Sequence, residues 1–304
     1  MHAGCGSPVL VQSFPSPGRV YNFAMEKSLV TAQELAQHLD DPSWVVFDVR
    51  HDLADTEKGR RAYAEGHIPG AHFLHMDEDL SGAKDGRNGR HPLPQARTFA
   101  QKLSGRGVGP RTQVVAYDDA GGSFAVRLWW MLRWLGHERV AVLDGGWPLW
   151  VKEERPVDRH TPRPRPGDFT PRPVPDASVD VHFVARTRDD PGVTLVDARA
   201  PDRYAGRQEP IDPVAGHVPG AINRFWQENL RADGRFKPGH ELREEFSALL
   251  GTARPGTVVH MCGSGVTACH NLFAMTLADL PPGRLYPGSW SEWCADSTRP
   301  VARD

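Results

Sequence analysis

The stretch VVHMCGSGVTACHN, residues 258–271, contains the change of pattern that decides the fold. An apolar run, 258–261, stops at Cys262 and gives way to a loop of small residues. After the loop, apolar residues recur at three- and four-residue steps between Cys269 and Thr276, which predicts a helix. One thiol is therefore expected where a buried strand ends and a helix begins.

The chain contains this pattern twice, because its two halves are internal repeats. Four collinear matches link them: VVFDVR (45–50) with TLVDAR (194–199), GHIPGA (66–71) with GHVPGA (216–221), VVAYDDAGGS (114–123) with VVHMCGSGVT (258–267), and DGGWPLW (144–150) with PGSWSEW (287–293). The matches keep the same order and nearly the same spacing, which indicates a duplicated domain.

The repeat predicts two domains of ordinary size, at 26–153 and 179–304. The segment 154–178 is rich in proline and arginine, and we expect it to be an extended linker between the domains. Residues 1–25 are crowded with glycine, proline and serine, which is typical of a flexible N-terminal extension.

Within each copy, short apolar runs alternate with helical segments. We expect strands at 45–48, 114–117, 140–143, 194–197 and 257–261. These runs lack polar alternation, as strands of a parallel sheet do when both faces are covered. A capping box at Thr31-x-x-Glu34 and an apolar segment, 124–136, ending at Gly136 predict helices between them. The expected fold is α/β, with two tandem domains, each a mostly parallel sheet with helices on both faces.

Composition excludes several classes of function. The 36 basic and 38 acidic residues give a formal net charge of −2, which does not favour a nucleic-acid partner or an anionic membrane surface. No apolar stretch reaches the roughly 18 residues that a membrane-spanning helix needs. Four cysteines in 304 residues are too few for a disulfide framework, so we expect a reducing, cytoplasmic location.

Cys262 has the surroundings of a nucleophile. Ligands of open α/β sheets bind beyond the carboxyl ends of the strands, where Cys262 falls. Gly263 and Gly265 lack a Cβ, so their N–H groups can approach a ligand closely, and the following helix adds partial positive charge. The thiol is therefore expected to ionise readily, and the same N–H groups would stabilise an anion carried on its sulfur.

Neighbouring residues do not share this role. Cys269 falls on the core face of the predicted helix, too far along it to form a disulfide with Cys262. The spacing of Cys262, Cys269 and His270 is not that of a zinc site, so no metal is expected. The first copy has Asp118 in place of Cys262, so that copy is predicted to be non-catalytic.

Together these residues resemble the tandem rhodanese family of sulfurtransferases over about residues 26–298. CGSGVT (262–267) is similar to the family's active loop, and GSWSEW (288–293) and the two GH-x-PGA segments support the match. The resemblance implies a reaction without a cofactor. The Cys262 thiolate takes a sulfane sulfur from a small donor and passes it to cyanide or to a thiol, with thioredoxin a candidate. The intermediate persulfide would be held by the loop, which adds Val266 and Thr267 to the glycines as binding residues.

The loop resembles the 3-mercaptopyruvate branch of the family, because Gly263 and Ser264 stand where thiosulfate enzymes carry cations. In that branch a serine works with a histidine and an aspartate. Ser264 matches the serine, and His67 of GHIPGA is identified as the histidine, reaching the loop from the first domain. No aspartate is assigned, although Asp55 and Glu57 lie near the expected position.

Mercaptopyruvate is a carboxylate and would need guanidinium groups to bind it. Arg203 matches the family's first substrate arginine. The second position is Ile211 here, so Arg207 is the candidate substitute, and thiosulfate remains the alternative donor.

The sequence gives less support to two other classes of function. A Cys-dependent phosphatase needs an arginine six positions after the cysteine, where this chain has Ala268. A non-catalytic binding module does not need Cys262 or its glycine-rich loop, and Asp118 shows how an inactive copy differs. A monomer is expected, because each half can cover the other's buried face.

Overall fold

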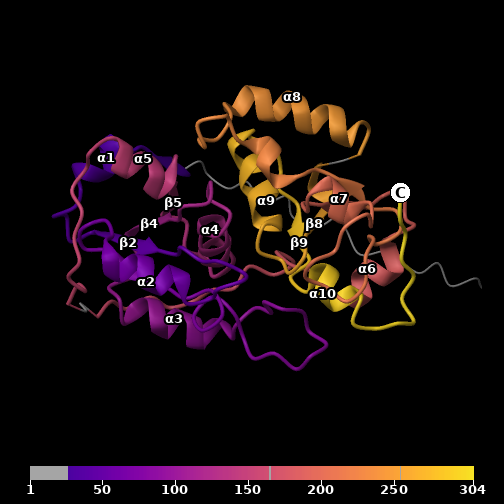
Figure 1. Ribbon diagram of the computed structural model, residues 1–304, viewed down its shortest axis with the longest axis horizontal. Coiled ribbons are helices and arrows are strands. Elements are labelled where there is room, and N and C mark those ends of the chain that lie inside the picture. Colours follow the sequence, from indigo (N-terminus) through magenta and orange to yellow (C-terminus); the bar gives the residue numbers. More distant parts are fainter. Residues whose placement is uncertain (1–26, 164–165, 254) are drawn as a thin grey trace, which may run out of the picture.

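The computed structural model describes residues 27–163, 166–253 and 255–304, and its two halves lie side by side (Figure 1). The N-terminal extension expected at 1–25 lies outside the described residues. The first half contains β1 (Leu29–Val30), α1 (Ala32–Ala36), β2 (Trp44–Asp48), α2 (Lys58–Glu65), β3 (His72–Phe73), α3 (Ala96–Ser104), β4 (Gln113–Tyr117), α4 (Ala125–Trp134), β5 (Val140–Leu143) and α5 (Gly146–Lys152). The second contains α6 (Val181–Thr187), β6 (Thr194–Asp197), α7 (Pro201–Tyr204), β7 (Ile222–Asn223), the 3₁₀ turn η1 (Trp226–Asn229), α8 (Gly239–Leu250), the 3₁₀ turn η2 (Pro255–Thr257), β8 (Val258–Met261), α9 (Ala268–Leu277), β9 (Arg284–Leu285) and α10 (Ser289–Trp293).

Each half is built on a parallel sheet, which confirms the predicted α/β fold. The strand orders are β1-β5-β4-β2-β3 and β7-β6-β8-β9, and every paired neighbour runs parallel. The matching strands β4 and β8 lie inside their sheets, and β8 is buried along its whole length. The loops that follow these two strands therefore open at corresponding places in the two domains.

The predicted helix signals are present in the structure. The Thr31 side chain accepts a hydrogen bond from the Glu34 N–H at 3.1 Å and starts α1, as the capping box requires. Helix α4 ends at Trp134, and Gly136 follows in the left-handed conformation, with φ of 80°. Of the helices in the described part of the chain, none has the length and apolar character needed to cross a membrane.

Helices α4 and α9 pack against each other at the boundary between the halves (Figure 1). Trp129 of α4 and Phe273 of α9 meet edge to face, with ring centroids 4.8 Å apart, and both are buried. A single apolar cluster continues from one half into the other through this contact. Each helix follows the loop of its own β4 or β8 strand, so the packing brings those two loops close to the boundary.

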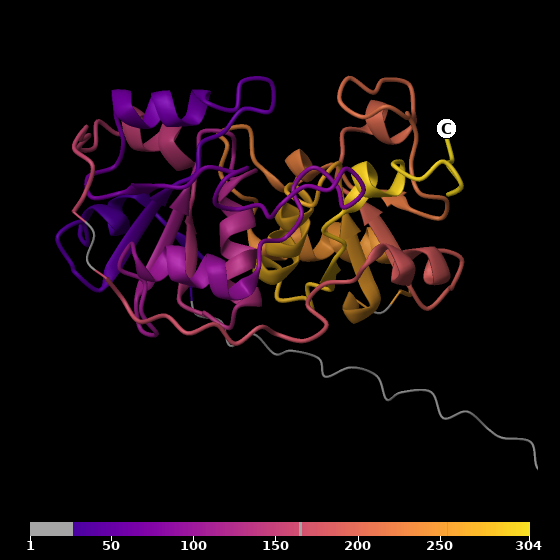
Figure 2. The ribbon, with the colours of Figure 1, turned by 90° about the horizontal axis from the view of Figure 1, so that it is seen from below.

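The predicted linker is extended but is attached to the first domain for much of its length. Asp158 pairs with His67 in an antiparallel bridge, and Phe169 is buried. The N–H groups of Arg172 and Val174 donate to carbonyls at the end of α4. In Figure 2 the chain between the halves follows one side of the molecule before it enters the second domain.

Two histidines of the second domain lie fully within the core. Burial lowers the pKa of His260 on β8 to about 3 and that of His270 on α9 to about 4. Their usual value is about 6.5, so in the unfolded chain they would bind protons at a pH where the folded chain does not.

We therefore expect acid to weaken the fold. Both pKa values are depressed in the folded state, so their contribution is complete above about pH 6.5 and falls as the pH drops towards 4. The free energy of unfolding should fall by about 1.4 kcal/mol per pH unit for each histidine. Urea unfolding at pH 7 and pH 5 measures this, and a His270→Phe variant should show a shallower slope. Equal stability at the two pH values would contradict the prediction.

Candidate active site

Cys262 follows β8, and its sulfur lies against main-chain N–H groups as predicted. The Gly265 N–H donates to Sγ at 3.1 Å and the Ser264 N–H at 3.5 Å. Cys262 is 2% exposed, and its own N–H donates to the Ser289 hydroxyl at 3.1 Å. Gly265 has φ of 75°, and a Cβ there would come within 2.3 Å of the Pro287 carbonyl oxygen, so the loop requires glycine at this position.

The first copy shows what this kind of loop binds. The Asp118 carboxylate is buried and accepts four main-chain hydrogen bonds of 2.8–2.9 Å, from the N–H groups of Ala120, Gly122, Phe124 and Ala125. A carboxylate oxygen lies two bonds beyond Cβ, as the outer sulfur of a cysteine persulfide does. The loop after β4 therefore directs its N–H groups at acceptor atoms that are as many bonds from Cβ as the outer sulfur of a persulfide on Cys262 would be.

His67 does not reach Ser264, which corrects the pairing expected from the sequence. Its ring stacks on Tyr63 at 3.9 Å, with Nδ1 2.7 Å from the Tyr63 carbonyl and Nε2 3.3 Å from the His160 carbonyl. His217 repeats this arrangement with Tyr204 in the second domain, with Nδ1 2.8 Å from the carbonyl. The His67 ring nitrogens thus face carbonyls of α2 and of the linker, and not Ser264.

The histidine at Ser264 is His91, which the sequence interpretation missed. Its Nδ1 is 2.7 Å from Ser264 Oγ, and its Nε2 is 3.6 Å from Asp77 Oδ1. A carboxylate only accepts, so Asp77 favours the tautomer with the proton on Nε2, which leaves Nδ1 to accept the Ser264 hydroxyl proton. Burial lowers the pKa of His91 to about 3, so the ring is neutral.

Asp77 is the acidic residue that the sequence left unassigned. Burial alone would raise its pKa, but the hydrogen bond and the charge of Lys84 hold it below the usual value, so it is ionised. Asp55 and Glu57, the residues near the expected position, instead pair with Arg61 and Arg60 at the surface. The serine of the loop, His91 and Asp77 therefore form one chain of contacts that crosses the domain boundary.

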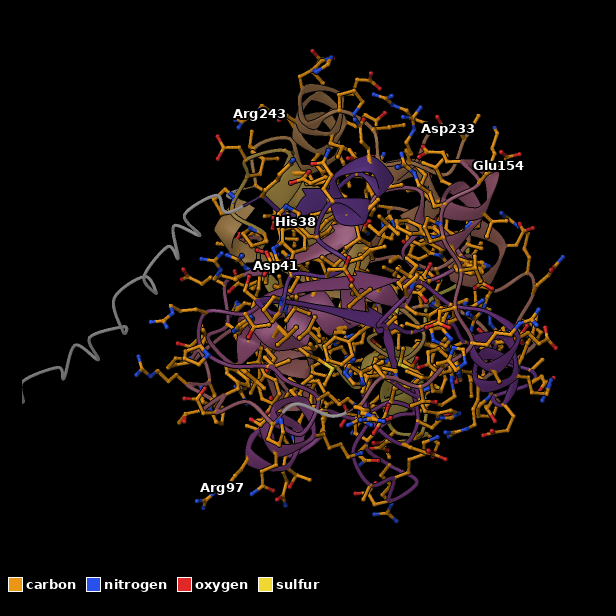
Figure 3. The ribbon with its side chains drawn as sticks, turned by 90° about the vertical axis from the view of Figure 1, so that its left-hand side faces the viewer. His38, Asp41, Arg97, Glu154, Asp233 and Arg243 are labelled. Carbon is orange, nitrogen blue, oxygen red and sulfur yellow. The ribbon has the colours of Figure 1, made fainter. Side chains whose placement is uncertain are left out.

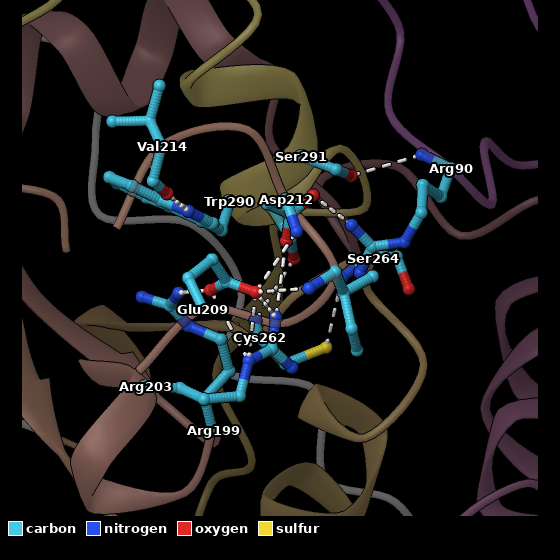
Figure 4. A network of polar contacts seen from close by, with 12 residues as sticks. Arg90, Arg199, Arg203, Glu209, Asp212, Val214, Cys262, Ser264, Trp290 and Ser291 are labelled. Carbon is cyan, nitrogen blue, oxygen red and sulfur yellow. Dashed lines mark hydrogen bonds and ion pairs between the residues drawn. The ribbon is translucent and has the colours of Figure 1, made fainter. Parts of the chain in front are cut away.

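Arg90 and Arg203 come from different domains and both approach Gly263, the residue after Cys262. Figure 4 shows the two arginines around Cys262. A Cβ on Gly263 would lie 2.7 Å from Arg90 Nη2 and 3.6 Å from the terminal nitrogens of Arg203. Arg203 donates to Glu209 at 2.6 Å and to Asp212 at 3.2 Å, and Arg90 also pairs with Asp212. Both guanidinium groups are held near the mouth of the loop.

Arg207 is not part of this arrangement. Its side chain is 58% exposed and pairs with Asp202 at 3.0 Å. Ile211, where the second substrate arginine was expected, is 41% exposed. In the structure the guanidinium that lies beside Gly263 together with that of Arg203 belongs to Arg90, a residue of the first domain that was not considered in the sequence interpretation.

Within the described residues, two groups of side chains come close enough to share a metal ion, and both include His75. Its Nδ1 accepts the N–H groups of Asp77 and Glu78, and its Nε2 lies 3.0 Å from the Thr56 carbonyl, to which it donates. Neither nitrogen has a lone pair free for a metal, so neither group is a complete ligand set.

Known proteins share this arrangement of domains. The Rhodanese-like domain family matches residues 31–153 and 180–296. The chain is 48% identical over 276 residues to the "Probable 3-mercaptopyruvate sulfurtransferase" of Pseudomonas aeruginosa, covering 90% of this chain and 97% of that protein. It is 34% identical over 277 residues to the thiosulfate sulfurtransferase of Bos taurus, with 88% and 92% covered. The crystal structure of SseA from Escherichia coli, described as a 3-mercaptopyruvate sulfotransferase, superposes with a TM-score of 0.76 and 32% identity, over 87% of this chain and 99% of that one.

Replacing the nucleophile tests the site directly. Cys262→Ser removes the sulfur that faces the N–H groups, so it should abolish both turnover and the mass increase of about 32 Da that one bound sulfur gives. Mass spectrometry of the intact protein after incubation with a sulfur donor measures the adduct. Cys269→Ser is the matched control, since that thiol is fully buried and burial raises its pKa to about 12. An adduct that persists in Cys262→Ser would show that another residue carries the sulfur.

Proposed function

This chain belongs to the tandem rhodanese family of sulfurtransferases, and we propose that it moves sulfur from 3-mercaptopyruvate to an acceptor thiol or cyanide through a persulfide on Cys262. The observation that carries the choice of donor is the contact between Ser264, His91 and Asp77 beside the nucleophile. Transfer from mercaptopyruvate requires a proton to be moved, and this chain of groups can move one.

The proton balance of the reaction explains this requirement. The Cys262 thiolate attacks the donor's sulfur, the bond from that sulfur to C3 breaks, and its electron pair goes to C3. The proton of the donor's thiol ends on C3, which gives pyruvate and leaves a persulfide anion on Cys262. The Ser264 N–H faces Cys262 Sγ and the Ser264 hydroxyl contacts His91, so in this proposal the hydroxyl takes that proton from the donor's sulfur and returns it at the carbon.

The same loop then serves the second half of the reaction. An acceptor thiolate attacks the outer sulfur, the S–S bond breaks, and Cys262 is released as a thiolate. The N–H groups of Ser264 and Gly265 already face Sγ, so the leaving thiolate is stabilised where it forms.

Arg90 and Arg203 supply the charge that a 2-oxo acid needs. They approach Gly263 from the two domains, so a carboxylate bound between them would place the donor's sulfur near Cys262. Asp212 lies between the two guanidinium groups in the structure and holds them together without a substrate. We therefore propose that Arg90, and not Arg207, is the second arginine that binds the donor's carboxylate.

Thiosulfate remains the second candidate donor, because two arginines would also attract a dianion. Its transfer releases sulfite and requires no proton at carbon, so it would not need Ser264 or His91. The two donors can therefore be separated by removing the proton path.

The expected compartment and acceptors follow from the thiol chemistry. Cys262, Cys269 and Cys294 are free and buried, which supports the proposal of a reducing, cytoplasmic location. A thioredoxin-like dithiol would suit such a compartment as an acceptor, alongside small thiols and cyanide. Because an apolar cluster already joins the two halves, we propose that a monomer is active.

We expect kcat/KM to be higher for mercaptopyruvate than for thiosulfate, and Ser264→Ala to reduce it selectively. Loss of the proton path should lower kcat with mercaptopyruvate by about 10²–10⁴-fold and leave thiosulfate turnover within a few-fold of its starting value. Steady-state kinetics with both donors measures this. A wild-type enzyme that prefers thiosulfate, or equal losses with both donors, would contradict the choice of donor.

Removing a guanidinium should weaken donor binding. Arg203→Ala and Arg90→Ala should each raise KM for mercaptopyruvate by roughly one to two decades, the size of a lost charge-assisted hydrogen bond of about 1.5–3 kcal/mol. Arg207→Ala should leave KM unchanged, because this side chain pairs with Asp202 in solvent. A KM increase in Arg207→Ala alone would restore the assignment made from the sequence.

A further inference from the structure

Arg127 on α4 is a buried cation in an unusual position. Its side chain is 0% exposed, and in the described part of the chain no carboxylate pairs with it. Its Nε has no hydrogen-bond partner among the described residues. Burying an unpaired charge is costly, so a guanidinium in this setting needs a compensating interaction nearby.

The two terminal nitrogens of Arg127 bind two carbonyls of the active site. Nη1 donates to the Gly265 carbonyl at 2.9 Å, and Nη2 donates to the His91 carbonyl at 3.0 Å. Gly265 belongs to the loop that faces the sulfur, and His91 is the histidine on Ser264. One side chain therefore contacts both the persulfide loop and the residue that would move the proton.

The contact with Gly265 fixes the orientation of one peptide of the loop. No peptide bond in the described chain is cis, and in a trans peptide the C=O and the next N–H point in opposite directions. With the Gly265 oxygen held by Arg127, the peptide between Gly265 and Val266 directs the Val266 N–H away from Arg127. That N–H lies four positions after Cys262.

The first domain contains the same kind of contact, beside the Asp118 carboxylate. His270 of α9 crosses the boundary in the other direction and lies 3.0 Å from the Gly121 carbonyl, with Nε2 as the donor. The next N–H, that of Gly122, is four positions after Asp118 and donates to its carboxylate at 2.9 Å. In this loop, the Gly121 carbonyl is held by a side chain from the other domain, and the next N–H donates to the Asp118 carboxylate.

The two cross-boundary side chains differ in charge. Burial lowers the pKa of His270 to about 4, so the loop that already contains the Asp118 carboxylate receives a neutral ring. The loop of Cys262 receives a cation. Cys269 does not balance that cation, because burial raises its pKa to about 12 and its thiol instead lies 3.5 Å from the Gly265 carbonyl.

We propose that Arg127 is a positioning residue for sulfur transfer: from the first domain it holds the Gly265 carbonyl and His91 together, and its buried charge is balanced by the anion on Cys262. The proposal rests on the persulfide function described above and assigns the non-catalytic domain a part in ionising the nucleophile. It requires that removing the cation changes the reactivity of Cys262 before any donor is added.

The test measures the reactivity of Cys262 in the donor-free protein. The rate of alkylation by iodoacetamide is followed at the Cys262 peptide by mass spectrometry between pH 5 and pH 10. In Arg127→Met the anionic sulfur loses its counter-charge, so alkylation near pH 7 should slow about tenfold. The persulfide adduct formed by mercaptopyruvate should also decay faster in this variant.

Arg127→Lys is the second variant and covers the case in which Arg127→Met does not fold. It keeps the charge but cannot hold both carbonyls, so the alkylation rate of Cys262 near pH 7 should stay within about twofold of wild type while kcat falls. His270→Phe removes the mirrored contact and should leave that rate unchanged. Arg243→Met, on the exposed face of α8 (Figure 3), is the surface control.

The outcomes separate this proposal from the proposed function. A wild-type alkylation rate of Cys262 in folded Arg127→Met, or a slowing in Arg127→Lys equal to that in the methionine variant, would overturn the role of the charge. An equal slowing in His270→Phe would show a general effect of the boundary and would also overturn it. A wild-type protein that forms no persulfide would refute the proposed function, while the alkylation profile would still report on Arg127.

Discussion

The site depends on one constraint, which is that N–H groups at the end of a parallel strand and the start of a helix need an acceptor. In the first domain the Asp118 carboxylate satisfies four of them permanently. In the second domain Cys262 Sγ accepts from two, those of Ser264 and Gly265. The same main-chain geometry thus serves as a structural element in one copy and as the holder of a reactive group in the other.

Much of the fold and part of the site could be predicted because they depend on local pattern. Uninterrupted apolar runs identified β4 and β8, the glycines located the Cys262 loop, and the repeat supplied both domains. Partners that come together only through tertiary packing could not be read in this way. Arg90 and His91 lie in a coil before α3, where no periodicity marks them.

The repeat itself contains evidence that His67 has a structural role and does not pair with Ser264. His67 has a counterpart, His217, in the catalytic domain, and both stack on a tyrosine in the same way. A residue needed in both copies is more consistent with a structural role. After the DGR that both copies contain, the first continues as NGRHPLP and the second as FKPG, so His91 lies in a segment particular to the first copy. This difference between the copies is the sequence feature that could have identified His91.

The division of the site between the halves has a consequence for how such a chain can evolve. The nucleophile is encoded in the second half, whereas His91, Asp77, Arg90 and Arg127 are all encoded in the first. A truncated gene that kept only the half with Cys262 would produce a thiol without these neighbours. Under the proposed mechanism the two copies therefore act as one catalytic unit, although the first has Asp118 at the position of the cysteine.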